Sequence, residues 1–238
     1  MDIAKIQRVP WDHFPDVLIV GDESRVKSHP AYESAKTGDA GSAKILSAAF
    51  VSPRILQEIQ ELGAGRKPVL VPVHAIEDRG INRIPAAFAE LLAGLMDLEV
   101  ADNIIQANVV SHTGATGWER MARPPAFDGQ VPAGTDCLLI DDFVGQGGTL
   151  ANLRSFLIHG GAKAIGAITL TGKDYSAKLA LNSATLDLLR HKHGPEIEIW
   201  WRQIFDYGFE CLTESEARYL LRAEDAHTIR ARILAARS

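Results

Sequence analysis

The stretch that decides the fold is residues 136–153, DCLLIDDFVGQGGTLANL. Four apolar residues at 137–140 lead directly into two adjacent carboxylates, Asp141 and Asp142. Two apolar residues and a glycine-rich turn follow, and apolar residues then recur at helical spacing from Leu150 onward. A short apolar run bounded by turn residues is typical of a parallel strand that is covered on both faces. The stretch therefore predicts a buried strand, a loop and a helix.

The glycine-rich turn at residues 145–149 has the properties of a phosphate-binding loop. Glycines let the backbone turn tightly and approach a ligand closely. The next helix offers unpaired amide N–H groups and the positive end of its dipole, which both favour phosphate. Asp141 and Asp142 are suited instead to accept hydrogen bonds from sugar hydroxyls, or to hold Mg²⁺ directly or through water. A ribose phosphate is therefore the predicted ligand. The alternative, a buried strand that ends in a solvated acidic turn, accounts more easily for one acid than for two.

The segment LLIDDFVGQGGTL resembles the phosphoribosyl-pyrophosphate (PRPP) motif of the type I phosphoribosyltransferases. Both have four apolar residues, two acids, two apolar residues and a loop of small residues. The resemblance implies an α/β fold with a central, mostly parallel sheet flanked by helices in three Rossmann-like layers, with helical additions at both ends. It also implies that Asp141 and Asp142 are catalytic, bind the PRPP ribose and help hold Mg²⁺. The implied 5′-phosphate ligands are Gly145, Gln146, Gly147, Gly148 and Thr149.

The segment departs from the family pattern at two places. The family usually has Ser or Thr at the first two loop positions, where this chain has Gly145 and Gln146. Phe143 is also bulkier than the usual residue at its position. Because the missing hydroxyls would remove phosphate contacts, the departures favour ligand binding over efficient catalysis.

A second buried strand is predicted at residues 68–73, PVLVPV, and an amphipathic helix at residues 86–95. In the resembled family, the loop between such elements binds pyrophosphate. Guanidinium groups match phosphate oxygens, and glycine permits close backbone approach. The candidate pyrophosphate ligands are Arg79, Gly80, Asn82 and Arg83. The alternative is a solvated loop in which the arginines pair with the neighbouring acids.

A long polar segment, residues 111–135, directly precedes the motif strand. Irregular loops of this length are often active-site lids. Type I phosphoribosyltransferases carry at this place a flexible loop that closes over the substrates and excludes water. His112, Arg120 and Arg123 are therefore candidates to meet the pyrophosphate, although the two arginines could equally be solvent-exposed. Trp118 is expected to pack the closed loop.

The apolar run at residues 164–171 predicts another strand after the motif helix. A strand–helix–strand unit favours a parallel sheet. In purine-using members of the resembled family, a lysine near the end of this strand can contact the base, which makes Lys173 the candidate base-binding residue. The alternation in EIEIWW, residues 196–201, predicts a later strand.

The two ends of the chain are predicted to be mainly helical. Asp39 and Ser52-Pro53 have the residue types of helix starts within residues 28–62, and His29-Pro30 could open the first helix. Thr213 and Glu216 fit a capping box. We expect one phosphoribosyltransferase-like domain over residues 1–238. Its predicted parts are a core at about 68–175, an N-terminal helical cap or hood at about 1–62 and a C-terminal extension at about 196–238.

Composition limits the compartment and the partners. The chain has 238 residues, 46% hydrophobic and 23% charged, as is typical of globular proteins. A net charge of −5 argues against nucleic acid as the main partner. The two cysteines do not predict a disulfide framework, and no signal peptide or run of about 18 apolar residues is evident. We therefore expect a cytoplasmic protein without a membrane partner.

The expected function is Mg²⁺-dependent transfer of 5-phosphoribose between PRPP and a nucleobase or related small-molecule acceptor, by a homodimer. The alternative is a regulator of the same fold that binds PRPP or a nucleotide without turnover. A dinucleotide-dependent oxidoreductase lacks support, since GQGG is not G-x-G-x-x-G. A P-loop kinase is also disfavoured, because no G-K-[ST] follows the glycines.

Overall fold

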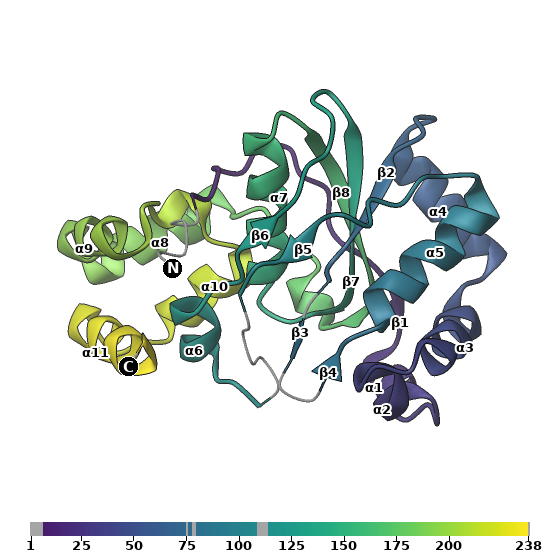
Figure 1. The fold of residues 1–238 in the computed structure, drawn as a ribbon. Helices are drawn as coiled ribbons and strands as arrows, with labels where there is room; N and C mark the ends of the chain where they lie inside the picture. The colour runs from purple at the N-terminus through teal and green to yellow at the C-terminus, as the bar shows by residue number, and fades with distance from the viewer. Residues whose placement is uncertain (1–6, 75, 78–79, 109–113, 238) are drawn as a thin grey trace.

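A four-stranded parallel sheet forms the centre of the molecule (Figure 1). The computed structural model describes residues 7–74, 76–77, 80–108 and 114–237. The strands of the sheet, in spatial order, are β1 (Leu18–Gly21), β8 (Lys163–Gly172), β7 (Asp136–Val144) and β2 (Val69–Pro72). Every neighbouring pair runs parallel. The predicted α/β class is thus confirmed, together with the motif strand and the strands predicted at residues 68–73 and 164–171.

The motif strand β7 is longer than its apolar run and includes the acid pair. It continues to Val144 because β8 pairs with it over that length, with Asp141 opposite Thr169 and Val144 opposite Gly172. On the other side, β2 ends at Pro72, opposite Ile140. The acid pair therefore lies beyond the end of β2. The helix that follows the motif, α7 (Gly148–His159), confirms the predicted strand–loop–helix.

Helices cover both faces of the sheet, as Figure 1 shows. Helices α3 (Ala40–Phe50), α4 (Pro53–Gly63) and α5 (Ile84–Met96) pack on one face, and α7 packs on the other. Successive strand residues face opposite ways. In β7, Leu138 and Ile140 belong to the core under α5, whereas Cys137 and Leu139 belong to the core under α7. This double burial is the reason for the continuous apolar run in the sequence.

The N-terminal helices begin at short polar caps. Asp39 accepts a hydrogen bond from the Ser42 amide, and Ser52 accepts one from the Ile55 amide, so both predicted caps are confirmed. The predicted start at His29-Pro30 is wrong. A short helix, α1 (Glu23–Lys27), already begins after the Asp22 cap, and α2 (Tyr32–Lys36) begins after Ala31.

The C-terminal helices build an apolar core of their own around the buried Trp201. They are α8 (Ser183–His193), α9 (Pro195–Phe205), α10 (Glu214–Leu221) and α11 (Ala226–Arg237). Figure 1 shows them grouped on the α7 side of the sheet. The predicted capping box is confirmed, because Thr213 and Glu216 exchange side-chain and backbone hydrogen bonds at the start of α10.

The strand predicted at residues 196–201 is wrong, because this segment lies in α9. Pro195 occupies the first turn, where its missing N–H costs no helical hydrogen bond. The buried residues Ile197, Trp201 and Phe205 recur every four positions, which is the helical period. Six residues of alternation were too short a window to reveal that period.

The segments before the motif strand contain more structure than expected. Within the predicted irregular segment, α6 (Gly117–Ala122) begins at a capping box of Thr116 and Glu119, a signal that the sequence prediction missed. Upstream of α6, β5 (Ile105–Gln106) pairs with β6 (Phe127–Asp128), and a bridge joins Val100 to Leu70. A second hairpin joins β3 (Ile76–Glu77) and β4 (Gly80–Ile81). Single 3₁₀ turns, η1 (Asp174–Ser176) and η2 (Phe209–Cys211), complete the elements.

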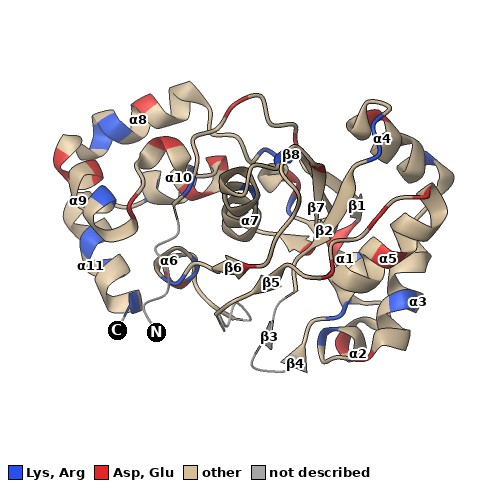
Figure 2. Cartoon of the chain, turned by 45° about the horizontal axis from the view of Figure 1, so that its top comes forward, with Lys and Arg blue, Asp and Glu red and all other residues tan. Residues whose placement is uncertain are grey.

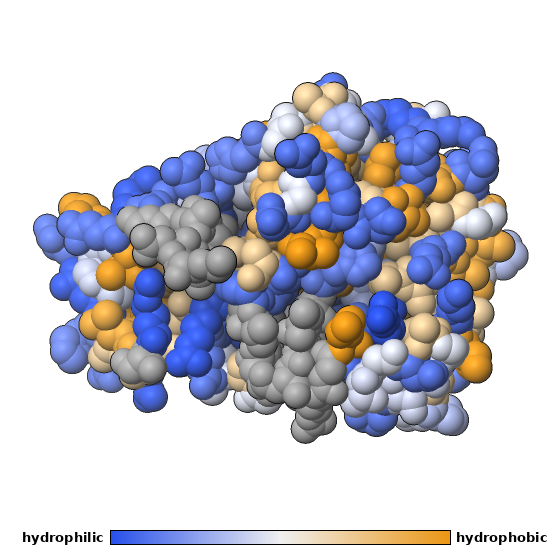
Figure 3. Space-filling view, viewed as in Figure 1, coloured by the Kyte–Doolittle hydropathy of each residue, from blue (hydrophilic) through white to orange (hydrophobic). Residues whose placement is uncertain are grey.

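The outer surface is polar and mixed in charge. Figure 2 shows basic and acidic residues interspersed along α8 and α9, where Arg190 and Arg202 both pair with Glu198 and Glu210. On the face seen in Figure 3, hydrophobic residues over these helices are scattered among hydrophilic ones, as is normal for a surface in water. Within the described part of the chain, no helix has the length and apolar character needed to cross a bilayer.

Candidate functional site

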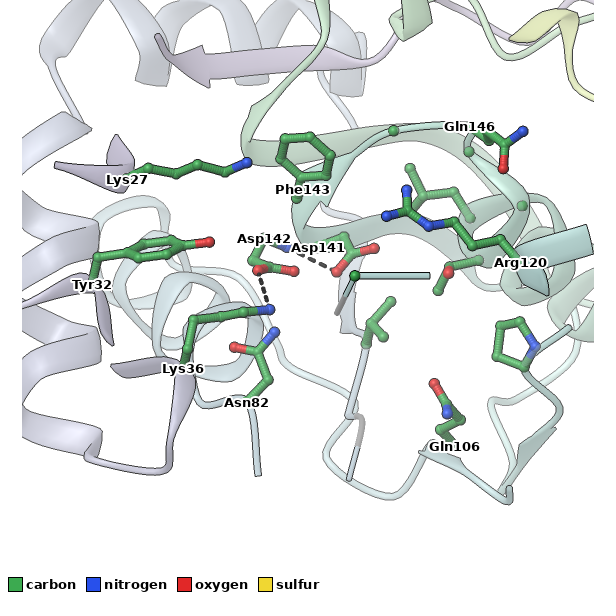
Figure 4. A pocket seen from close by; sticks show the side chains of 18 of the residues that line it. Lys27, Tyr32, Lys36, Asn82, Gln106, Arg120, Asp141, Asp142, Phe143 and Gln146 are labelled. Carbon is green, nitrogen blue, oxygen red and sulfur yellow. Dashed lines mark hydrogen bonds and ion pairs between the residues drawn. The ribbon is translucent and has the colours of Figure 1, made fainter. Parts of the chain in front are cut away.

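A cavity of about 330 Å³ lies at the carboxyl end of β7 (Figure 4). Ligands of open parallel sheets bind outside the carboxyl ends of the strands, and the volume suits a small molecule. The N-terminal helices α1 and α2, the loop after β7, the start of α7, helix α6 and helix α10 all contribute residues. The lining residues are Lys27, Tyr32, Glu33, Lys36, Thr37, Val73, Asn82, Gln106, Gly114, Arg120, Pro125, Glu216 and those at 141–143 and 145–150.

The acid pair lies in the wall of this cavity, as the motif predicted. Asp141 and Asp142 are 6% and 8% exposed. The ammonium group of Lys36, from α2, lies 3.0 Å from the Asp142 carboxylate (Figure 4). The Asp142 amide donates a hydrogen bond of 2.8 Å to the Asp141 carboxylate. Two carboxylates and one lysine therefore meet at one point.

The pKa values of the two acids are shifted in opposite directions. Burial, and then the charge of Asp142, raise the pKa of Asp141 well above its usual range. Burial also opposes the charge on Asp142, but the Lys36 ammonium lowers the pKa of Asp142 below its usual value. Asp142 is consequently the firmly ionised member of the pair, while ionisation of Asp141 is opposed by its surroundings.

Asn82 completes this acidic end of the cavity. Its carbonyl oxygen accepts a hydrogen bond of 3.2 Å from the Ile84 amide at the start of α5. Its side chain also hydrogen-bonds Asp142, which helps to lower the pKa of that acid. The amide is 4% exposed and is therefore held in place on both sides.

Of the four predicted pyrophosphate ligands, Asn82 lines the cavity. Gly80 lies in β4, where its backbone pairs with Glu77. Arg83 does not line the cavity either, and its backbone N–H donates to the carbonyl of Ala35. Arg79 lies outside the described residues. The structure thus brings one predicted residue to the acid pair, from the loop that the sequence indicated.

The glycine loop places all five predicted residues, 145–149, on the cavity wall. Gly147 has φ +78° and forms the N-cap of α7. No hydrogen bond between described residues uses the amide N–H of Gly147, Gly148 or Thr149. The three residues line a ligand-sized space at a helix N-terminus, which is a favourable environment for an anion.

Gln146 contributes to the loop through its backbone. Its side chain points away from the acid pair (Figure 4). The side-chain amide atoms are buried and make no hydrogen bond with a described residue. They lie beside Gly117 of α6. The expected loss of a hydroxyl ligand at this position is thus not compensated by the longer side chain.

We expect Gly147→Ala to disable this loop. A β-carbon at Gly147 would collide with Leu179, and the left-handed φ is also unfavourable for alanine. The matched control is Gly65→Ala, because Gly65 has φ +75° but no atom within 4 Å of the added carbon. Both variants should lose roughly 1–2 kcal/mol of stability from backbone strain. Binding of ribose 5-phosphate, measured by calorimetry, should fail in Gly147→Ala alone. Equal binding by both variants would show that the loop does not hold the ligand.

The predicted lid contributes Arg120 from α6. Its guanidinium lies beside Gly145, with Nη1 3.1 Å from the position that a β-carbon on that glycine would occupy. Arg123, at the end of the same helix, is exposed and does not line the cavity. His112 lies outside the described residues. Trp118 packs edge-on against Tyr219 of α10, at 5.0 Å between ring centroids, while closure of the loop over a ligand stays a prediction.

Lys173 does not line the cavity. Its ammonium group lies 2.5 Å from the Glu23 carboxylate of α1, and its side chain is 42% exposed. Because Glu23 also pairs with Lys27, which does line the cavity, Lys173 contacts the site indirectly. The structure therefore gives the predicted base contact of Lys173 no direct support.

Several lining residues were missed by the sequence analysis, chiefly those from α1 and α2. Lys27 places its ammonium 4.6 Å from the ring centroid of Phe143, within cation–π range. Tyr32 and Lys36 are four residues apart and so share a face of α2. That spacing is visible in the sequence, but it does not say which face meets the motif strand.

The cavity offers a few oxygen ligands that suit Mg²⁺ when a substrate supplies the others. Asp141, Asp142 and Asn82 offer the oxygen ligands that Mg²⁺ prefers. Among the described residues, no group of three or more His, Cys, Asp or Glu side chains could hold a metal ion by itself. Mg²⁺ commonly uses one or two carboxylates and takes its other ligands from substrate phosphates and water. The site fits an ion that arrives with a phosphorylated substrate.

The fold and the site together define an α/β protein whose parallel sheet carries a polar small-molecule pocket at the carboxyl end of its central strand. Comparison with known proteins gives relatives but no established activity. No family model matches the chain. It is 37% identical to protein TraN of Escherichia coli over 235 residues, 99% of this chain and 52% of TraN. It is 40% identical to an uncharacterized protein of Haemophilus influenzae over 152 residues, 63% of this chain and 34% of the other. The chain thus spans about half the length, or less, of these relatives.

Solved structures resemble the chain only distantly. An adenine phosphoribosyltransferase matches with a TM-score of 0.38 and 16% identity, over 58% of this chain and 73% of the enzyme. The UMP synthase of Leishmania donovani matches with a TM-score of 0.32 and 16% identity, over 71% of this chain and 33% of that protein. At this level of likeness, the fold assignment depends on the sheet order and helix layers of the chain itself.

Proposed function

We propose that the cavity binds PRPP and that the chain transfers 5-phosphoribose between PRPP and a nucleobase or related heterocyclic acceptor. One observation carries the proposal. A buried pair of acids at the end of the central parallel strand faces the same cavity as a glycine loop that opens a helix. Carboxylates suit the ribose hydroxyls, and the loop amides suit the 5′-phosphate. The two groups occur together and in the chain order of the resembled motif.

The acid pair would bind the ribose through Asp142 first, because Asp142 is the ionised member. In the structure its carboxylate is engaged by Lys36. Ribose hydroxyls would replace the ammonium group of Lys36, which would then face the departing pyrophosphate. Arg120, beside the glycine loop, would add a second positive charge. Fixed charges that meet a developing negative charge are the strongest common source of catalysis.

Mg²⁺ held by Asp141 or Asp142 together with substrate oxygens would neutralise the charge of the leaving pyrophosphate. The residues of the chain would supply position. Asp142 and Asn82 would orient the ribose, while α6 and the N-terminal helices would limit access of water to the ribosyl carbon. The homodimer, the cytoplasmic location and the identity of the acceptor stay predictions.

A second candidate is a regulator that binds PRPP or a nucleotide without turnover. The composition of the loop favours it, since Gly145 has no side chain and the Gln146 side chain points away from the acids. Fewer phosphate contacts would reduce positioning more than they would abolish binding.

A pyrophosphate-release assay tests the proposal and separates the two candidates. With PRPP, Mg²⁺ and a panel of nucleobases, we expect release with at least one base and its loss on addition of EDTA. The Asp142→Asn variant provides the blank, since it keeps the shape of the side chain but removes the ionised acid. Tight binding of PRPP with no release for any base would favour the regulator. Failure to bind PRPP would reject both candidates.

A further inference from the structure

Residues from both ends of the chain form a wall behind the glycine loop. The Thr213 hydroxyl, at the N-cap of α10, donates a hydrogen bond of 2.5 Å to the carbonyl of Gln146. The Arg8 guanidinium donates a longer bond, 3.5 Å, to the carbonyl of Gly148. The backbone carbonyls of Gln146 and Gly148 are thus both directed toward this wall.

Peptide geometry then fixes where the loop amides point. A trans peptide is planar, and its C=O and N–H bonds point in opposite directions. No cis peptide occurs in the described residues. Because the Gln146 carbonyl faces Thr213, the amide of Gly147 faces the other way. By the same argument, the amide of Thr149 points away from Arg8. Gly147 and Thr149 both line the cavity.

The wall also contains a charge that would oppose an anion if it stood alone. Glu216 of α10 lines the cavity, and its carboxylate would contact a β-carbon at Gly148. Arg8 binds both carboxylate oxygens, at 2.5 and 2.9 Å, and the two side chains are 2% exposed. Burial opposes the charge of Arg8, but Glu216 keeps its pKa above the usual value. The bidentate pair therefore neutralises the carboxylate beside the loop.

Arg8 is held in turn by α7 and by the C-terminal helices. Its Nε donates a hydrogen bond of 2.6 Å to Asn152 of α7. Its guanidinium lies 5.0 Å from the ring centroid of Tyr207. The Glu216 carboxylate also accepts a bond of 2.9 Å from the Thr213 amide in the capping box. The capping box, Arg8 and the loop form one connected set of hydrogen bonds.

We propose that Thr213, Arg8 and Glu216 are positioning residues of the phosphate site, which hold the amides of Gly147 and Thr149 toward the phosphate group of the ligand. This inference rests on the proposed function, because it assumes that the loop binds phosphate. It gives the C-terminal helices and the N-terminal segment a part in ligand binding, although neither belongs to the strand–loop–helix motif. None of the three side chains needs to touch the ligand for this role.

The first test compares three variants for binding of ribose 5-phosphate and of inorganic phosphate. Thr213→Val removes the hydroxyl and keeps the shape, and Thr213→Ser restores the hydroxyl. Asn182→Ala is the matched control, because Asn182 caps the neighbouring helix α8 through the Ala184 amide and does not line the cavity. We expect about tenfold weaker binding in Thr213→Val, the usual effect of one lost hydrogen bond. Thr213→Ser and Asn182→Ala should bind like wild type.

The second test uses Arg8→Lys, which keeps the charge but loses the fork that spans Glu216 and the loop. Its control is Arg154→Lys. Arg154 is also 2% exposed and holds the same N-terminal segment through the carbonyls of Val9 and Pro10. We expect Arg8→Lys to bind phosphate about threefold more weakly than wild type. Arg154→Lys should bind phosphate with wild-type affinity. This pair decides the question even if Thr213→Val does not fold.

The measurement is the ¹H–¹⁵N NMR shift of the amides of Gly147 and Thr149 during each titration. Shifts of these amides in wild type, reduced in Thr213→Val and Arg8→Lys, would support the inference even if PRPP is never turned over. Wild-type affinity and wild-type amide shifts in both variants would overturn it, whatever the result with PRPP. Absence of phosphate binding to the wild-type loop would overturn the inference together with the proposed function.

Discussion

The double variant Asp141→Asn/Asp142→Asn is expected to lose PRPP binding by a factor of at least about 100 in calorimetric titration with Mg²⁺. Hydrogen bonds to charged acceptors contribute about 1.5–3 kcal/mol each, and each 1.4 kcal/mol is a factor of ten in affinity. Asparagine has nearly the shape of aspartate, so the change removes charge and leaves volume. Asp141 and Asp142 are largely buried in the cavity wall, where little solvent screens their charges.

The control for this variant is Asp39→Asn. Asp39 is an exposed N-cap of α3 that does not line the cavity, and asparagine caps helices about as well as aspartate. It should bind PRPP like wild type. Binding of ribose 5-phosphate should weaken in parallel with binding of PRPP in the double variant, because the two ligands share ribose hydroxyls. Unchanged PRPP affinity in the double variant would remove the basis of the proposed function.

The two single variants should change stability in opposite directions at pH 7. Burial raises the pKa of Asp141 in the folded state. The folded protein therefore loses stability as the pH rises from the pKa of an aspartate in the unfolded chain, about 3.9, through the raised pKa of the folded state. Asp141→Asn removes that loss and should raise the unfolding temperature. The pKa of Asp142 is lowered in the folded state, so its ionisation stabilises the fold at pH values above the pKa of the unfolded chain. Asp142→Asn should therefore lower the unfolding temperature. A binding defect with increased stability cannot be attributed to misfolding.

The motif segment could be predicted because its signals are local. Each of its signals is a pattern among residues that are close together in the chain. They are the apolar run of residues 137–140, the glycines and the helical spacing after Leu150. The same holds for the caps at Asp39, Ser52 and Thr213. In such places the backbone conformation is decided within a few residues, so composition and spacing suffice.

The remainder of the site depends on contacts between distant segments. Lys36 reaches Asp142 across 106 positions of sequence, and Arg8 reaches Glu216 across 208. No local pattern distinguishes these residues from ordinary surface lysines or arginines. Arg154 illustrates the same limit, because a buried arginine on α7 reads in the sequence as a polar position on an exposed face. Such pairings become visible when the tertiary packing is known.

Glu216→Ala is expected to destabilise the fold by roughly 3–5 kcal/mol, the usual cost of leaving a buried charge without its partner. The variant strands the Arg8 guanidinium among Asn152, Tyr207 and the Gly148 carbonyl, with no carboxylate to offset its desolvation. It also removes one half of the α10 capping box. Thermal unfolding followed by circular dichroism measures the loss. Lys67→Ala is the control, since the Lys67–Asp97 pair is also 2.5 Å long but lies on the surface, and its removal should leave the unfolding midpoint unchanged.

A double variant distinguishes a stranded charge from lost packing. Arg8→Met/Glu216→Met removes both charges and keeps apolar volume, and buried pairs replaced in this way commonly lose little stability. We therefore expect it to recover a large part of the loss seen in Glu216→Ala. A double variant as unstable as Glu216→Ala would mean that the hydrogen bonds of Arg8 to Asn152 and the loop, rather than the charge balance, hold the N-terminal segment against the C-terminal helices. In that case the connection between the two ends of the chain depends on the shape of the guanidinium fork, and Arg8→Lys should be nearly as unstable as either variant.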